Sequence, residues 1–76
     1  GDLAKAIKTV DQAIVLEPTV AKSHSLRARI LFEMDRPEPA MASADEAIRL
    51  DPTLTEAHYI RGNVLERVSE FSQASE

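Results

Sequence analysis

Residues 40–52 have the sequence AMASADEAIRLDP, and a similar stretch occurs once earlier in the chain. When the sequence is shifted against itself by 34 positions, 11 of the 42 aligned pairs are identical. The identical pairs are Ala6/Ala40, Asp11/Asp45, Ala13/Ala47, Ile14/Ile48, Leu16/Leu50, Pro18/Pro52, Thr19/Thr53, His24/His58, Arg27/Arg61, Leu31/Leu65 and Ala40/Ala74. A period near 34 residues indicates an internal repeat.

The composition is that of an ordinary globular protein, with 43% hydrophobic and 29% charged residues. A chain of 76 residues makes at most one small domain. The net charge of −4, without a basic cluster, makes nucleic acid an unexpected partner. The absence of cysteine excludes disulfide bonds and thiolate metal sites and leaves the compartment open. No apolar run approaches the roughly 20 residues of a membrane span, and no signal peptide is recognised.

Apolar residues at spacings of three and four predict an all-α fold of four helices and the start of a fifth. The expected ranges are 2–17, 20–34, 37–50, a fourth helix that ends near Val68, and 70–76 after a turn at Ser69. The first and third helices are expected to turn inward Leu3, Ala6, Ile7, Val10, Ala13, Ile14 and Leu16, and Ala40, Met41, Ala44, Ala47, Ile48 and Leu50. For the second and fourth, the inward residues are His24, Ala28, Leu31 and either Arg27 or Phe32, and Ala57, His58, Ile60, Gly62, Leu65 and Val68.

Prolines and hydroxyl residues mark the expected helix boundaries. Pro18 and Pro52 end the first and third helices, because proline has no N–H and pushes the preceding residue out of the helical region. Thr19 is expected to cap the second helix. Thr53 and Glu56 have the Thr-x-x-Glu spacing of a capping box for the fourth.

The connections are only a few residues long, so consecutive helices are expected to pack antiparallel as hairpins. The repeated unit is then two helices and two turns. Stacked units bury faces that no single unit buries alone, which predicts an α-solenoid.

This pattern resembles the tetratricopeptide repeat family, whose unit is a 34-residue helix-turn-helix with small residues at helix contacts and a proline near its end. The residues that match the small positions are Ala28 and Gly62 in the first helix of the unit, and Ala6, Ala13, Ala40, Ala47 and Ala74 in the second. The late proline matches Pro18 and Pro52. The resemblance divides the chain into the second half of one repeat (1–20), a complete repeat (21–54) and an incomplete repeat (55–76).

The chain departs from the family pattern at several positions. His24 and His58 replace a large aromatic residue early in the unit. Asp35 and Ser69 replace the glycine expected between the two helices, and Asp tolerates a left-handed backbone better than Ser does. In this frame the first helix lacks the neighbour that would cover Ile7, Val10 and Ile14, so we expect either a fragment of a longer array or an assembly in which another copy supplies the missing face.

The resemblance implies an interaction module without enzymatic activity, whose concave groove binds a protein or peptide. The groove residues would be Lys22, Ser25, Arg29 and Glu33 of one unit and Tyr59 and Asn63 of the next, beside Glu56 and Glu66. An ordinary solvated surface is the competing interpretation. The exposed terminal helices could instead pair with another copy to form a homo-oligomer. A third reading is a repeat region that positions the substrate for a catalytic domain elsewhere in a larger enzyme.

No residue pattern points to chemistry. His24 and His58 are expected to be packed structural residues, because two histidines without a carboxylate make a weak metal site. Asp11 and the Asp45-Glu46 pair are expected on solvated faces, since acid-base catalysis requires a cleft and a shifted pKa. Phosphate-binding loops, nucleophile elbows and zinc-protease sequences are absent. We therefore expect no catalytic residues, no cofactor and no metal.

Overall fold

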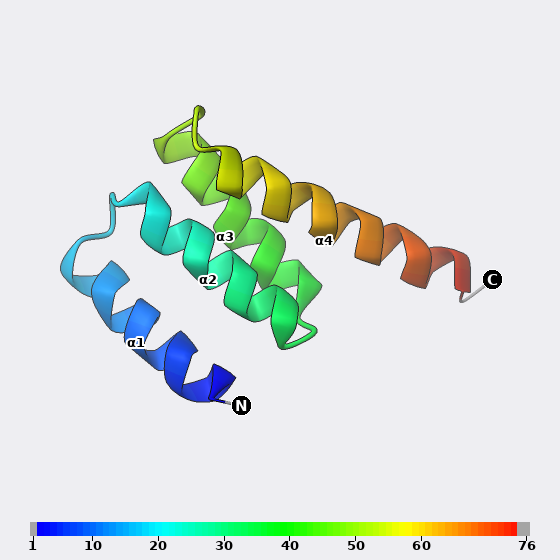
Figure 1. Cartoon of the computed structure of the whole chain (residues 1–76), viewed down its shortest axis with the longest axis horizontal. Helices are drawn as coiled ribbons and strands as arrows, with labels where there is room; N and C mark the ends of the chain where they lie inside the picture. Colours follow the sequence, from blue (N-terminus) through cyan, green and yellow to red (C-terminus); the bar gives the residue numbers. More distant parts are fainter. Residues whose placement is uncertain (1, 75–76) are drawn as a thin grey trace.

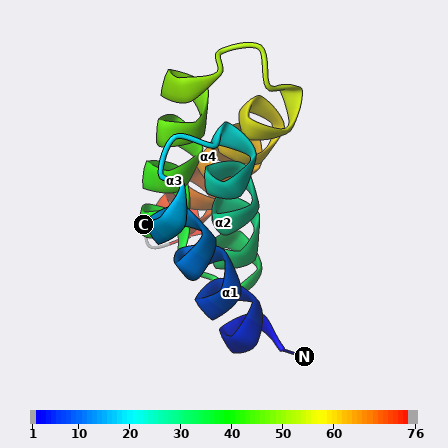
Figure 2. The ribbon, with the colours of Figure 1, turned by 90° about the vertical axis from the view of Figure 1, so that its left-hand side faces the viewer.

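The structure is a computed structural model that describes residues 2–74, with side chains for residues 2–70, and this part of the chain is entirely helical apart from its turns. The four helices are α1 (Leu3–Leu16), α2 (Ala21–Glu33), α3 (Pro37–Leu50) and α4 (Thr55–Ala74). They pack against one another, with α1 and α4 at opposite edges of the molecule (Figure 1). Seen from the α1 side, α1 lies in front of α2 and α3 (Figure 2). The prediction of an all-α fold is confirmed.

The first three helices begin and end within one residue of the predicted boundaries. At the ends of α1 and α3, the residues before the two prolines adopt nearly the same backbone conformation. The N–H groups of Glu17 and Asp51 donate to the carbonyl oxygens of Ala13 and Ala47, each at 2.9 Å. The two prolines therefore end their helices in the same way.

Both predicted side-chain caps are wrong. The N-cap of α2 is Val20, so Thr19 lies one residue too early for its hydroxyl to reach the free amides of the first turn. Thr53 does not form the capping box with Glu56. Its hydroxyl donates instead to Asp51 Oδ1 at 2.6 Å, and its backbone N–H donates to the same oxygen at 3.1 Å. The aspartate thus closes the turn that the threonine was expected to serve.

The predicted turn at Ser69 is also wrong, because α4 continues through this residue to Ala74. At the equivalent position of α2, Asp35 adopts the left-handed conformation with φ of 60°. The N–H of Asp35 then donates to Phe32 O at 3.0 Å and that of Arg36 to Leu31 O at 2.9 Å, which is the Schellman arrangement. Serine tolerates the left-handed region less well, so the helix continues. Residues 75–76 of the expected fifth helix lie outside the described part.

The molecule is thin, with principal extents of 43, 29 and 15 Å. Half of the buried apolar residues are alanines. The whole set is Val10, Ala28, Ile30, Leu31, Ala40, Ala44, Ala47, Ala57, Ile60 and Val64. Alanine at these contacts lets the helices approach closely.

The inward faces are predicted well for α3 and poorly for α1 and α4. In α3, the three expected alanines Ala40, Ala44 and Ala47 are buried. In α1, Val10 is buried under α2, so the expectation that nothing covers it is wrong, while Leu16 is 81% exposed. In α4, Ala57 and Ile60 are buried as expected, Val64 is buried without having been expected, and the exposed residues are His58, Gly62, Leu65 and Val68.

The position of each helix explains these differences. α2 contacts α1, α3 and α4, whereas α1 contacts α2, and α4 contacts α2 and α3. A helical face with no neighbour stays in solvent however apolar its sequence is. On α2, the alternative between Arg27 and Phe32 is not resolved in favour of either, since both side chains are half-buried.

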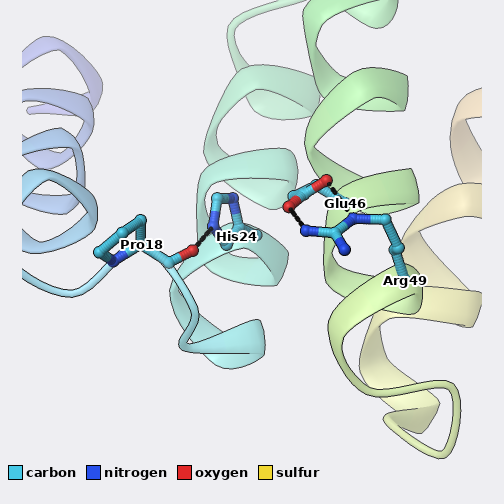
Figure 3. Close-up of polar contacts among 4 residues, drawn as sticks. All are labelled: Pro18, His24, Glu46 and Arg49. Carbon is cyan, nitrogen blue, oxygen red and sulfur yellow. Dashed lines mark hydrogen bonds and ion pairs between the residues drawn. The ribbon is translucent and has the colours of Figure 1, made fainter.

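The sequence repeat is also a repeat of contacts. His24 Nε2 lies 2.8 Å from Pro18 O (Figure 3), and His58 Nε2 lies 2.7 Å from Pro52 O. In the same way, Arg27 Nε donates to Asp11 Oδ1 at 2.7 Å, and Arg61 Nε donates to Asp45 Oδ1 at 2.8 Å. Four pairs of identical residues thus make two kinds of contact, each twice and 34 residues apart.

Candidate functional site

A shallow hollow of about 370 Å³ lies between α2 and α4. Its lining is Arg29, Phe32 and Glu33 from α2, and Glu56, Tyr59, Ile60 and Asn63 from α4. Ile60 is buried and Phe32 is half-buried, so they form an apolar floor, and the charged and amide groups form the rim. The structure therefore brings residues of two successive units to one surface.

Four of the six residues named from the sequence meet at this hollow: Arg29, Glu33, Tyr59 and Asn63. Tyr59 is 68% exposed, which leaves most of its ring available to another molecule. Arg29 Nε lies 3.5 Å from Glu33 Oε1, one helical turn away. An exposed pair at this distance contributes little to stability, so either group can exchange its partner for a ligand at small cost.

The other two residues lie elsewhere. Lys22 is exposed on the first turn of α2 and does not line the hollow. Ser25 was expected to face the groove, and this is wrong because its side chain is completely buried. Its hydroxyl has no hydrogen-bond partner among the described residues. The equivalent residue of the next unit is Tyr59, and a serine at this place is small enough to be covered by the neighbouring helices.

A second and larger hollow, of about 630 Å³, lies between α1 and α2 and was not expected. Ala6, Val10 and Ile30 contribute apolar surface to it, and Thr9 lies on its wall. Arg29 and Glu33 line both hollows, so the ion pair between them separates the two. The sequence predicted that the first two helices pack as a hairpin and that the first helix lacks a further neighbour, but it did not predict a hollow between the two.

Arg67 of α4 is a further residue that sequence reasoning missed. Its guanidinium carbon lies 4.5 Å from the centre of the Phe32 ring, and its Nη1 donates to Asp35 Oδ1 at 3.2 Å. Arg67 therefore holds α4 against the end of α2 and fixes one side of the hollow floor. The equivalent residue of the preceding unit is Glu33, so the 34-residue comparison could not reveal this contact.

The histidines are engaged in structural contacts. Each Nε2 faces a carbonyl oxygen, which can only accept, so this nitrogen carries the proton and donates, as Figure 3 shows for His24. Over the residues that the structure describes, no group of three or more histidine, cysteine, aspartate or glutamate side chains is placed to hold a metal ion.

Among the described residues, two acidic side chains have shifted pKa values, and both lie outside the hollow between α2 and α4. The hydrogen bond from Arg49 lowers the pKa of Glu46, and the same contact raises the pKa of Arg49 (Figure 3). The hydroxyl and the backbone N–H of Thr53 lower the pKa of Asp51. Hydrogen bonds to the charged form explain these directions. Each shift belongs to a surface contact that stabilises a helix or a turn.

Comparisons with protein-family models, with curated proteins and with solved structures gave no match to this chain. Within the described residues, none of the helices combines the length and the apolar character that crossing a membrane requires. The features of the chain that bear on function are therefore the repeated contacts and the two hollows.

Proposed function

We propose that this chain is a protein-interaction module of the tetratricopeptide type, stacked as an α-solenoid, and that the hollow between α2 and α4 binds a segment of another protein or a peptide. The observation that carries the proposal is the meeting of Arg29, Glu33, Tyr59 and Asn63 above an apolar floor. The first two come from α2 and the last two from α4, and these helices are one sequence period apart. The recurring His–Pro and Arg–Asp contacts support the repeat on which the proposal depends.

The chemistry of the hollow indicates the kind of segment that fits it. Ile60 and Phe32 offer apolar surface to one side chain of the segment. Tyr59 adds an exposed aromatic ring, a residue type that is enriched among the side chains that dominate binding energy. Asn63 can both donate to and accept from a peptide backbone, and Arg29 can donate to a carboxylate or carbonyl. An extended segment with an apolar anchor and free backbone groups satisfies these contacts.

The test is selection of peptides from a displayed random library on the unmodified chain, followed by affinity measurement on the variant Tyr59→Ala/Arg29→Ala. We expect the double variant to bind the selected peptides at least roughly thirtyfold more weakly, because loss of a dominant contact costs about 2 kcal/mol or more. Helicity measured by circular dichroism should not change, since both side chains are exposed.

The matched control is Arg49→Ala, which removes an exposed arginine with a carboxylate partner at a distance from the hollow. Its affinity for the selected peptides should equal that of the unmodified chain. If the double variant binds these peptides as tightly as the unmodified chain does, the hollow is not the binding site.

A further inference from the structure

α2 occupies a groove of its own chain. It packs against both α3 and α4, and the residues that it helps to bury include Ala40 and Ala44 of α3 and Ile60 and Val64 of α4. On the α2 side, Ala28 and Leu31 enter the same cluster. The groove formed by α3 and α4, filled by α2, is therefore the central packing arrangement of the molecule.

The hollow between α1 and α2 has the lining of that groove, shifted by one period. Six of its residues are Ala6, Thr9, Val10, Ala13, Leu26 and Ile30. A shift of 34 positions takes them to Ala40, Ser43, Ala44, Ala47, Ile60 and Val64 in the same order. All six equivalents are buried. The hollow is therefore the groove in which α2 sits, repeated at the other end of the molecule without a helix in it.

The helix that corresponds to α2 is α4, and its matching face is exposed. Gly62 and Leu65 are equivalent to Ala28 and Leu31. Leu31 is 5% exposed and Leu65 is 46% exposed. A Cβ atom built on Gly62 has no described heavy atom within 4 Å, so the space that α3 fills beside Ala28 is open beside Gly62. One end of the chain presents an unfilled groove, and the other presents the face that fits it.

A polar contact follows the same correspondence. Within the chain, the Arg27 guanidinium donates through Nη1 to Ser43 Oγ at 2.5 Å. The equivalent pair is Arg61 on α4 and Thr9 on the wall of the hollow, at opposite ends of the chain. The Thr9 hydroxyl donates to Lys5 O at 3.1 Å, so its oxygen can still accept a hydrogen bond. The polar groups of the two surfaces are thus as complementary as the apolar ones.

From these correspondences we infer that a second copy of this chain inserts the Gly62 face of its α4 into the hollow between α1 and α2, reproducing the packing of α2 within its groove. The contact joins two different surfaces, so it is head-to-tail, and each added copy leaves one groove and one face free. Association therefore continues with concentration and does not stop at a two-fold dimer.

Two substitutions block the two surfaces separately. Gly62→Gln adds a side chain where Ala28 leaves room only for a methyl group, and Ala13→Gln does the same where its equivalent Ala47 is fully buried. Neither residue is buried in the single chain, so the fold tolerates both changes. Each variant should raise the concentration at which copies associate by roughly tenfold or more, because overpacking of a close contact is destabilising. The measurement is the mass-averaged molar mass from light scattering over a concentration series.

The matched controls are Gly62→Ala and Ala4→Gln. Gly62→Ala reproduces Ala28 and should keep association while raising the melting temperature, since alanine favours a helix over glycine. Ala4 is exposed, and so is its equivalent Glu38, so Ala4→Gln should leave association unchanged. Gly62→Gln should also raise the melting temperature of the single chain, so that lost association with retained stability excludes simple unfolding.

Mixing the two blocked variants is the decisive measurement. Gly62→Gln keeps a free groove and Ala13→Gln keeps a free α4 face, so an equimolar mixture should form a 1:1 dimer and nothing larger, although each variant alone is monomeric. An unmodified chain that stays monomeric at millimolar concentration overturns the inference. Dimers of Ala13→Gln alone also overturn it, because they require α4 to pair with α4.

The inference does not rest on peptide binding in the other hollow. Neither Gly62 nor Ala13 lines the hollow between α2 and α4. The monomeric variants should therefore bind the selected peptides as the unmodified chain does. Loss of association with retained peptide binding, or the reverse, identifies which of the two proposals has failed.

Discussion

α2 and α4 occupy equivalent positions of the sequence repeat, and they have very different surroundings. α2 has neighbours on three sides, whereas α4 has α2 and α3 on one side and solvent on the other. The consequence is visible at single positions: Leu31 is buried and Leu65 is exposed, and Ala28 is buried and Gly62 is open. The sequence pattern determines which face of a helix is suited to packing. The neighbouring helices determine whether that face is packed.

Truncating the equivalent leucines of α2 and α4 should affect stability very differently. Leu31→Ala should lower the free energy of unfolding by about 2–5 kcal/mol, because it leaves a cavity among packed side chains. Leu65→Ala should change it by no more than about 0.5 kcal/mol, as surface substitutions do. Urea denaturation at low protein concentration, where copies do not associate, measures both. An equal loss of stability for the two variants would mean that another part of the protein buries Leu65.

A smaller effect compares the two buried serines of α2 and α3. Ser43 accepts a hydrogen bond from Arg27, whereas Ser25 has no partner among the described residues. Ser43→Ala should cost about 1–3 kcal/mol, since it leaves a guanidinium N–H without its acceptor. Ser25→Ala should leave the stability unchanged or raise it, because a buried hydroxyl without a partner is itself unfavourable. Thermal melts of the two variants check the sign, and a clear loss for Ser25→Ala would contradict the burial of this hydroxyl without a partner.

The smallest effect compares the two proline turns. Asp51 accepts two hydrogen bonds from Thr53, and they lower its pKa below the ordinary value of an aspartate. A carboxyl group with a lowered pKa in the folded state stabilises that state when the pH is above the pKa of the group in the unfolded chain. This contribution is lost as the pH falls through the lowered pKa. Asp51→Asn should therefore lower the melting temperature at neutral pH and make no difference at a pH well below the lowered pKa of Asp51.

The control for the proline turns is Glu17→Gln in the preceding turn. Glu17 is equivalent to Asp51, but the side-chain hydrogen bonds of the described residues include none between Glu17 and Thr19. This variant should show no comparable pH-dependent loss. A loss at neutral pH as large as that of Asp51→Asn would show that the charge, and not the hydrogen bonds to Thr53, stabilises the turn.

The sequence was sufficient for the features that depend on local chemistry. Proline position and apolar spacing predicted the ends of α1, α2 and α3 to within a residue. The repeat predicted the alanines of α3 that lie at helix contacts. It failed where the answer depended on a neighbour or on competition between side chains. Thr53 has the spacing of a cap, but its hydroxyl binds Asp51 instead. Ser69 has the position of a turn, but nothing forces its backbone into the left-handed region, and the helix continues.

The candidate hollow was predicted in part for the same reason. Helical spacing placed Arg29, Tyr59 and Asn63 on corresponding faces, and the structure brings them together. Ser25 is on the same side of its helix by spacing, but its small side chain is covered. The role of the hollow between α1 and α2 could not be predicted from the sequence, because the prediction requires knowing which residues of α3 and α4 are buried. Only then does the 34-residue correspondence show what the groove would accommodate.

Arg27 joins three helices through one guanidinium group, because it extends from α2, donates to Asp11 of α1 and donates to Ser43 of α3. If α1 opens transiently, Arg27 loses one acceptor and α3 loses none of its own helical hydrogen bonds. The residue therefore contributes to the cooperativity between helices more than to the intrinsic stability of any one of them. In amide hydrogen exchange, its removal should make the protection of α1 independent of that of α3, so that the two helices exchange as separate units.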